Sequence, residues 1–241
     1  MNNATRDRGG ALRLSAILLL VGQILYVLVT LLHTGGEAND HPAIFAAYAA
    51  SDTWTAVHVA QFACTAIIVA GLLALFVGLD PEPESAQWTA RFAAASTVAA
   101  FALYGAVLAV DGVALKQAVV AWMNAPEAEK AARFATAELA RWLEWGTRSY
   151  ENFALGLALL LFAATALRTS LPRPVAYLMG LSGLAYWVQG WTAGAEGFSS
   201  SHVIGIEAAE VFNAVWAIWL LFTSGRTRGA MAMTSSAGRA A

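Results

Sequence analysis

Six long apolar stretches constrain this chain more than any other feature of its sequence. A helix needs about 20 mostly apolar residues to cross the hydrocarbon core of a bilayer, and the six stretches reach or exceed that length. The predicted membrane spans cover residues 12–33, 54–79, 88–116, 141–167, 174–193 and 202–223. Prolines mark the connections between the spans, as expected of a residue that interrupts helices.

The composition indicates that most of the protein surface faces something other than water. Charged residues make up 12% of the chain and hydrophobic residues 59%, whereas an ordinary soluble domain has about 25% charged residues. The sequence therefore predicts an integral membrane protein whose main partner is the lipid bilayer. A formal net charge of −2 and the lack of a Lys/Arg cluster argue against nucleic-acid binding. The single cysteine, Cys64, excludes an intrachain disulfide.

Two connections are long enough to form short helices outside the membrane. Asp40 as an N-cap, followed by Pro42, predicts a helix over residues 43–50. Acidic residues after Pro126 predict an amphipathic helix within residues 125–140. The expected fold is all-α: a polytopic membrane protein with six transmembrane helices in a bundle and two short extracytoplasmic helices. The expected division is a cytoplasmic N-terminal segment at 1–11, a transmembrane domain at 12–224 and a disordered cytoplasmic tail at 225–241.

The placement of Lys and Arg predicts the orientation in the membrane. With the N-terminus in the cytoplasm, nine of the fourteen Lys and Arg residues lie inside and twelve of the sixteen acidic residues lie outside. Short connections that face the cytoplasm carry an excess of Lys and Arg, and this bias is clearest at residues 168–174 and 225–229. Both termini are therefore expected to be cytoplasmic.

Polar residues within the predicted spans gather in the outer halves. The sixth span carries Glu207, Glu210 and Asn213 in its first half, and a carboxylate in hydrocarbon is costly unless it is paired, protonated or facing water. Inner halves such as residues 153–167 are almost entirely apolar. We therefore predict a polar and aromatic pocket that opens outward. Its predicted lining is His33, His58, Glu144, Arg148, Glu151, Gln189, Glu207, Glu210 and Asn213, with Trp187 and Trp191 as an aromatic wall.

The same residues also allow structural interpretations. Glu144 and Arg148 are four residues apart and could form an ion pair at a helix end. Arg148 could instead form a salt bridge with Glu207 or Glu210, which would fix the helices relative to one another.

Three classes of function are compatible with this pattern. The first is a protein that binds, or helps to move, a small or amphipathic molecule or lipid. The second is a membrane-embedded enzyme, either with acid-type chemistry on an isoprenoid or lipid or as a metal-dependent hydrolase. The third is a structural or accessory membrane subunit. Candidate proton donors are Glu207, Glu210 and Asp111, and candidate metal ligands are His33, His58 and His202. The sequence contains no HExxH, P-loop or GxSxG motif and assigns no cofactor.

The last two spans resemble a known family. Residues 170–191, SLPRPVAYLMGLSGLAYWVQGW, place Leu-Pro-Arg before a glycine-containing helix, and the final helix combines Glu210 with Trp219, Leu220 and Leu221. In these features the chain resembles the bacterial six-helix integral membrane family described as domain of unknown function 4386. The resemblance extends over most of residues 10–225. It implies a six-helix bundle in the bacterial inner (plasma) membrane and assigns no activity.

Overall fold

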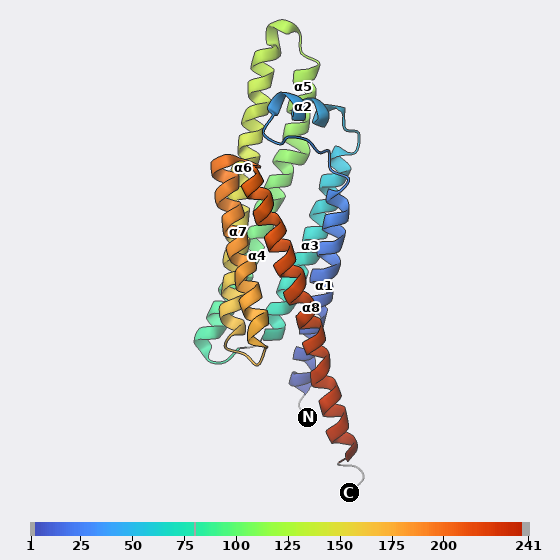
Figure 1. The fold of residues 1–241 in the computed structure, drawn as a ribbon, viewed down its shortest axis with the longest axis vertical. Helices are drawn as coiled ribbons and strands as arrows, with labels where there is room; N and C mark the ends of the chain where they lie inside the picture. The colour runs from blue at the N-terminus through green and yellow to red at the C-terminus, as the bar shows by residue number, and fades with distance from the viewer. Residues whose placement is uncertain (1–2, 80, 238–241) are drawn as a thin grey trace.

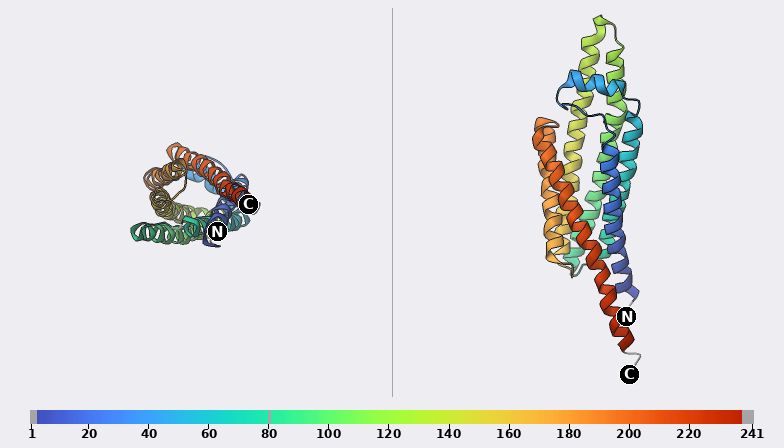
Figure 2. Two further views of the ribbon diagram at one scale, coloured as in Figure 1. Left: turned by 90° about the horizontal axis from the view of Figure 1, so that it is seen from below. Right: turned by 45° about the vertical axis from the view of Figure 1, so that its right-hand side comes forward.

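The chain folds into long helices that run side by side, with one short helix across an end of the bundle (Figures 1 and 2). The computed structural model describes residues 3–79 and 81–237. In chain order the helices are α1 (Asn3–Thr30), α2 (His41–Ala50), α3 (Trp54–Leu79), α4 (Glu84–Ala109), the π-helical segment η1 (Val110–Leu115), α5 (Lys116–Met123), α6 (Glu127–Ala166), α7 (Arg173–Glu196) and α8 (Ser200–Ala237). The all-α prediction is confirmed.

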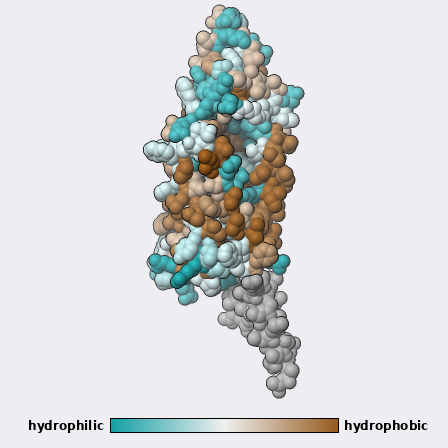
Figure 3. Space-filling view, viewed as in Figure 1, coloured by the Kyte–Doolittle hydropathy of each residue, from teal (hydrophilic) through white to brown (hydrophobic). Residues whose placement is uncertain are grey.

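Five helices among the described residues are long and apolar enough to cross a membrane: Arg8–Thr30, Trp54–Leu79, Glu84–Met123, Glu127–Ala166 and Ser200–Thr223. On the face shown in Figure 3, a belt of apolar residues crosses the middle of the molecule, and polar residues lie above and below it. Large apolar side chains such as Phe92 on α4 and Ile204 on α8 are exposed on the outside of the bundle. These observations support a multi-pass membrane protein.

The count of six spans is not confirmed. The fifth predicted span corresponds to α7, which packs between α6 and α8, but α7 is not among the five helices that are apolar enough to qualify. Glycine, serine, threonine and glutamine dilute its hydropathy. Small residues also allow close packing: a Cβ atom added at Gly156 of α6 would lie 2.7 Å from the carbonyl oxygen of Gly183 on α7. This spacing is typical of helices that pack tightly in membranes.

The end of the bundle that carries α2 differs from the prediction in one respect. Residues 127–140 do not form a separate short helix, because they continue without a break into the 40-residue helix α6. Good helix formers fill this range, and it contains no proline or glycine that would end the helix. Together with α5, this part of α6 forms a hairpin that extends beyond the rest of the bundle (Figure 1).

Helix α2 was predicted correctly and has a clear local cause. The Asp40 side chain accepts a hydrogen bond from the Ala43 backbone N–H at 3.3 Å, and Pro42 occupies the first turn. Phe45 and Tyr48 are buried against the α5–α6 hairpin, in a cluster that includes Trp54 of α3. The helix therefore caps the bundle through protein contacts.

The opposite half of the bundle has a dry apolar core. Its largest buried side chains include Leu72, Leu75, Phe162, Met179 and Leu220. The beginning of α1 and the end of α8 lie at this same end (Figure 1).

Both terminal helices extend beyond the predicted domain limits. Helix α1 begins at Asn3 instead of residue 12, and α8 continues to Ala237, through most of the range for which a disordered tail is predicted. Alanine, methionine and arginine residues in the tail favour helix, so α8 can continue through this range. Residues 1–2 and 238–241 lie outside the described part of the chain.

Candidate binding pocket

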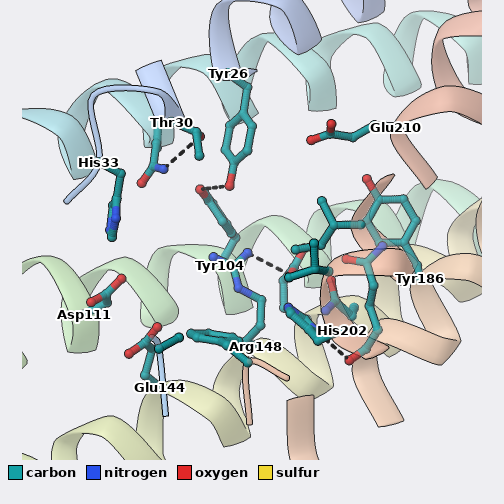
Figure 4. Close-up of a pocket in the computed structure, with 18 of the residues that line it drawn as sticks. Tyr26, Thr30, His33, Tyr104, Asp111, Glu144, Arg148, Tyr186, His202 and Glu210 are labelled. Carbon is teal, nitrogen blue, oxygen red and sulfur yellow. Dashed lines mark hydrogen bonds and ion pairs between the residues drawn. The ribbon is translucent and has the colours of Figure 1, made fainter. Parts of the chain in front are cut away.

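A cavity of about 790 Å³ lies between the long helices. Side chains from α1, α2, α3, α4, η1, α6, α7 and α8 line it, together with the α1–α2 and α7–α8 connections. Figure 4 shows His33, Asp111 and Glu144 at one end of the cavity and Glu210 and Tyr186 toward the other. Protein interiors are normally close-packed, so a space of this size inside a bundle is a feature that the fold maintains.

The π-helical segment η1 forms one wall at the end near α2. Its Asp111 is 7% exposed, and one of its carboxylate oxygens, Oδ2, lies 2.8 Å from Nε2 of His58 on α3. The Trp54 indole Nε1–H donates to the backbone carbonyl of Asp111 at 3.0 Å. A Cβ atom at Gly112 would lie 2.8 Å from the Cβ of His58, so glycine allows the two helices to meet here. Single π turns inside α-helices are frequent at functional sites.

His33 completes a group of three polar side chains with His58 and Asp111. One potential ligand atom from each residue lies within 4.8 Å of the others. The His33 and His58 ring centroids are 5.2 Å apart, and the indole of Trp54 lies 4.7 Å from the His33 ring. Three segments that are far apart in the sequence therefore bring histidine and carboxylate side chains together.

A buried ion pair lies on α6 beside this group. Nη1 of Arg141 donates to Oε2 of Glu144 at 2.7 Å, and both side chains are 2% exposed. Arg141 also donates to the Ala38 carbonyl at 3.1 Å and lies over the Phe198 ring at 4.7 Å. Arg141 thus ties the α1–α2 connection and the α7–α8 connection to α6.

Arg148 lies one level deeper and does not form the predicted ion pairs. Its Nη1 is 3.5 Å from Oε2 of Glu151, and its guanidinium lies over the Tyr104 ring at 5.0 Å. Among the described residues none of Glu144, Glu207 and Glu210 pairs with it, and Glu144 pairs with Arg141 instead. On a helix, partners three and four residues away are both within reach, so the tertiary surroundings decide between them.

The α7–α8 wall is held by hydrogen bonds between side chains and backbone. Gln189 donates to the Gly205 carbonyl at 3.0 Å, and Nδ1 of His202 donates to the Gln189 carbonyl at 3.2 Å. Asn213 donates to the Tyr186 hydroxyl at 3.3 Å. His202 lines the cavity but lies outside the group formed by His33 and His58. Of the three histidines considered as metal ligands, His33 and His58 therefore lie together with Asp111, and His202 lies apart from them.

The cavity lining contains most, but not all, of the predicted pocket residues. His33, Glu144, Arg148, Glu151, Gln189, Glu210 and Asn213 line it, and His58 lies directly behind Asp111. Trp187, Trp191 and Glu207 do not line it and are exposed on the outside of the bundle.

Helix geometry explains the three residues that face outward. Successive residues on a helix are about 100° apart, so Trp187 and Trp191 point away from the side that carries Gln189. Glu207 is displaced from Glu210 by about 60°, enough to place it on the exposed surface. The aromatic wall and the Glu207 proton donor are thus not part of this cavity.

Sequence reasoning missed Arg141, Tyr48 and Tyr186 as pocket residues. Two of them carried a usable signal. Arg141 precedes Glu144 by three residues, and Tyr186 precedes Gln189 by three, so each shares a helix face with a predicted lining residue. Tyr48 reaches the cavity only because α2 folds back over the bundle.

Two titratable groups outside the spans are perturbed by burial. Burial lowers the pKa of His33, against the opposing effect of the Asp111 charge. Burial also raises the pKa of Tyr48 to about 12. At neutral pH, therefore, His33 is a neutral imidazole and Tyr48 a neutral phenol.

No family model, curated protein or solved structure matches this chain. The resemblance to the six-helix family described above therefore stays a prediction, and the geometry of the cavity is the basis for assigning a function.

Proposed function

We propose that this multi-pass membrane protein binds a small amphipathic molecule in the cavity between its helices. The observation that carries the proposal is the graded lining of the cavity. Charged and hydrogen-bonding side chains surround the end near α2, and the deeper part is lined by apolar residues: Leu19, Ile68, Leu72, Leu155, Leu159 and Trp216. A polar head would lie at the level of Arg148 and an apolar chain below it.

The charges of the lining favour a head group that carries positive charge. Acidic lining residues are Glu37, Asp111, Glu144, Glu151 and Glu210, whereas the basic ones are Arg141 and Arg148. Each arginine is paired with one glutamate. Glu37 and Glu210 remain without an ion-pair partner among the described residues and attract a cation. Tyr26 and Tyr186 offer aromatic faces nearby.

We infer that the cavity opens at the end near α2, its mouth, and is closed at the other end. The connection between α1 and α2 lines the cavity, and Asn39 within it donates to the Glu196 carbonyl at 3.0 Å. The apolar core around Leu75 and Phe162 closes the deep end. With the predicted orientation, the mouth faces the extracytoplasmic side. A cavity closed at one end supports binding over passage through a continuous channel.

A purely structural role for the polar residues is less well supported. Side chains that serve only to lock helices together would be expected to fill the space between them. The cavity instead leaves about 790 Å³ unfilled beside the two arginines. This volume is within the range of pockets that hold drug-sized ligands, about 300–1,000 Å³.

Native mass spectrometry in mild detergent tests the proposal with three probes that share a twelve-carbon chain: dodecylamine, dodecylphosphocholine and dodecanoate. We expect dodecylamine to bind with about one molecule per chain, and dodecanoate to bind at least tenfold more weakly, because the lining is acidic. Thr65 lines the cavity, so Thr65→Trp should abolish binding by filling it. Val59 is 65% exposed on the same helix, and Val59→Trp is the matched control.

Equal binding of dodecylamine to wild type, Thr65→Trp and Val59→Trp would show attachment outside the cavity and would refute the proposal. Binding of none of the probes, with all three proteins folded, would favour the accessory role.

A further inference from the structure

We propose that His33, His58 and Asp111 form a binding site for one divalent transition-metal ion. Histidine nitrogens and a carboxylate oxygen are the usual ligands of zinc, and two histidines with one carboxylate also suit iron(II). Their potential ligand atoms lie within 4.8 Å of one another. Zinc–ligand bonds of about 2.0–2.2 Å at tetrahedral angles place ligand atoms about 3.3–3.6 Å apart. Coordination would therefore bring His33 closer and slightly separate His58 Nε2 from Asp111 Oδ2, which are 2.8 Å apart.

The hydrogen bonds of His58 are the first argument for a cation at this point. Its Nδ1–H donates to the Trp54 carbonyl at 2.7 Å, so in a neutral ring Nε2 carries no hydrogen. Yet Nε2 lies 2.8 Å from Oδ2 of Asp111, which is an acceptor. Two acceptors at this distance require either a proton between them, carried by the ring or by the carboxyl group, or a cation that binds both atoms.

His33 has the same arrangement. Its Nδ1–H donates to the Thr34 carbonyl at 3.0 Å, which leaves Nε2 available as a ligand atom. Histidine ligands of metal ions usually donate their other ring N–H to a carboxylate, carbonyl or water, and this bond fixes both the tautomer and the direction of the ring. Backbone carbonyls therefore prepare both rings for coordination.

Asp111 supplies the second argument. Its Oδ1 is buried and has no hydrogen-bond partner, although the residue is only 7% exposed. Buried carboxylate oxygens without donors are unfavourable, and a metal ion would satisfy this one. The Trp54 indole holds the Asp111 backbone, and η1 turns its side chain toward the two histidines.

Neighbouring cationic side chains are already engaged elsewhere. Lys116 donates to the carbonyls of Tyr48, Ala49 and Ser51 at 2.7–2.9 Å. Arg141 pairs with Glu144 at 2.7 Å. Among the described residues, His58 is the one ion-pair partner of Asp111. A metal ion would match the Asp111 charge without a proton shared with His58.

Three protein ligands leave at least one coordination position open. His33 and Asp111 line the cavity, so the open position faces it. Such an ion is what the metal-dependent hydrolase considered from the sequence would require, with Asp111 in place of His202. The metal site does not depend on the amphipathic ligand proposed above, because it is built from the protein's own side chains.

The test uses the full chain in mild detergent, treated with a chelator and then reloaded with ZnCl₂ or CoCl₂. Metal content by mass spectrometry should reach about one ion per chain in the wild type. After reloading, bound cobalt(II) should absorb visible light, and its spectrum should depend on which nitrogen and oxygen atoms bind the ion. Asp111→Asn preserves the side-chain shape, and His33→Ala changes a residue in the α1–α2 connection; each should weaken binding at least tenfold.

His41→Gln is the matched control, because His41 lies on α2, outside the cavity lining, and pairs with Glu138. It should bind metal as the wild type does. The proposal is overturned if the wild type retains no more zinc than Asp111→Asn, which would leave His58 and Asp111 as a pair joined by a proton. Equal loss of zinc in His41→Gln would overturn it too. If Asp111→Asn does not fold, His33→Ala and the wild-type cobalt spectrum decide the outcome.

Discussion

Replacing Glu144 with leucine tests whether the buried ion pair on α6 holds the mouth of the cavity together. The carboxylate and the Arg141 guanidinium are 2.7 Å apart and each 2% exposed, so both charges are largely removed from bulk water. Removing one partner of a buried pair typically costs about 3–5 kcal/mol, because the other charge stays buried. We expect a loss of this size for Glu144→Leu and for Arg141→Leu.

The double variant distinguishes the energy of the Arg141–Glu144 pair from the energy of its other contacts. Replacing both residues with leucine leaves neither partner as an unpaired buried charge, and the main loss is the hydrogen bond from Arg141 to the Ala38 carbonyl, worth about 0.5–1.5 kcal/mol. The double variant should therefore be more stable than either single one. The coupling energy from the four proteins should be about 2 kcal/mol or more.

Unfolding in mixed micelles with increasing SDS, followed by tryptophan fluorescence, measures these free energies. The exposed pair of Arg133 and Glu129 is the control, with side chains 52% and 54% exposed. Its coupling energy should be about 0.2–0.5 kcal/mol. If the two losses at Glu144 and Arg141 simply added, to within about 0.5 kcal/mol, the pair would not act as a unit and the reasoning would fail.

Three further results are expected. Gly156→Leu should destabilise the bundle by about 1–3 kcal/mol, because its side chain would press on the α7 backbone; an unchanged SDS midpoint would contradict the close approach. Gly112→Ala should displace the ring of His58 and weaken zinc binding about tenfold or more, with metal content at fixed free zinc as the readout; unchanged affinity would argue against the geometry. Gln23→Leu removes the 2.7 Å hydrogen bond to the Glu210 carbonyl that joins α1 to α8. It should cost about 0.5–1.5 kcal/mol in the same unfolding assay, and greater stability would show that the bond is not made.

Sequence reasoning was most successful where a local signal was strong. Apolar length located the long helices, and Asp40 followed by Pro42 located α2 with its cap. The prediction failed at residues 127–140, which look like a separate amphipathic helix. No proline or glycine interrupts them, so they continue directly into the rest of α6. The prediction that polar residues of different spans would gather in one place agrees with the cavity lining.

Which residues face the cavity and which residues pair depends on how the helices pack together. The spacing of polar and apolar residues along one helix does not contain this information. Glu207 and Glu210 are equally polar, and only the rotation of α8 decides that Glu210 reaches the cavity. Arg148 had partners within reach on either side, and Glu151 was selected because Glu144 is held by Arg141. The approach of Asp111 to the two histidines requires both the π turn and the packing of three separate segments.

The π turn at η1 also changes which side of the continuous helix Glu84–Met123 is buried before and after the turn. Buried positions on α4 are spaced by three and four residues, such as Ala93, Thr97, Ala100 and Tyr104, whereas those from Val107 through Asp111 and Leu115 to Val119 are each four apart. An extra residue in a turn rotates everything beyond it by about 100°. The part before η1 can thus face the bundle, while the part after it faces α2 and the beginning of α6. One continuous helix thus packs against two sets of neighbours. We expect a displacement of Asp111 to rotate α5 together with α2, which packs against it.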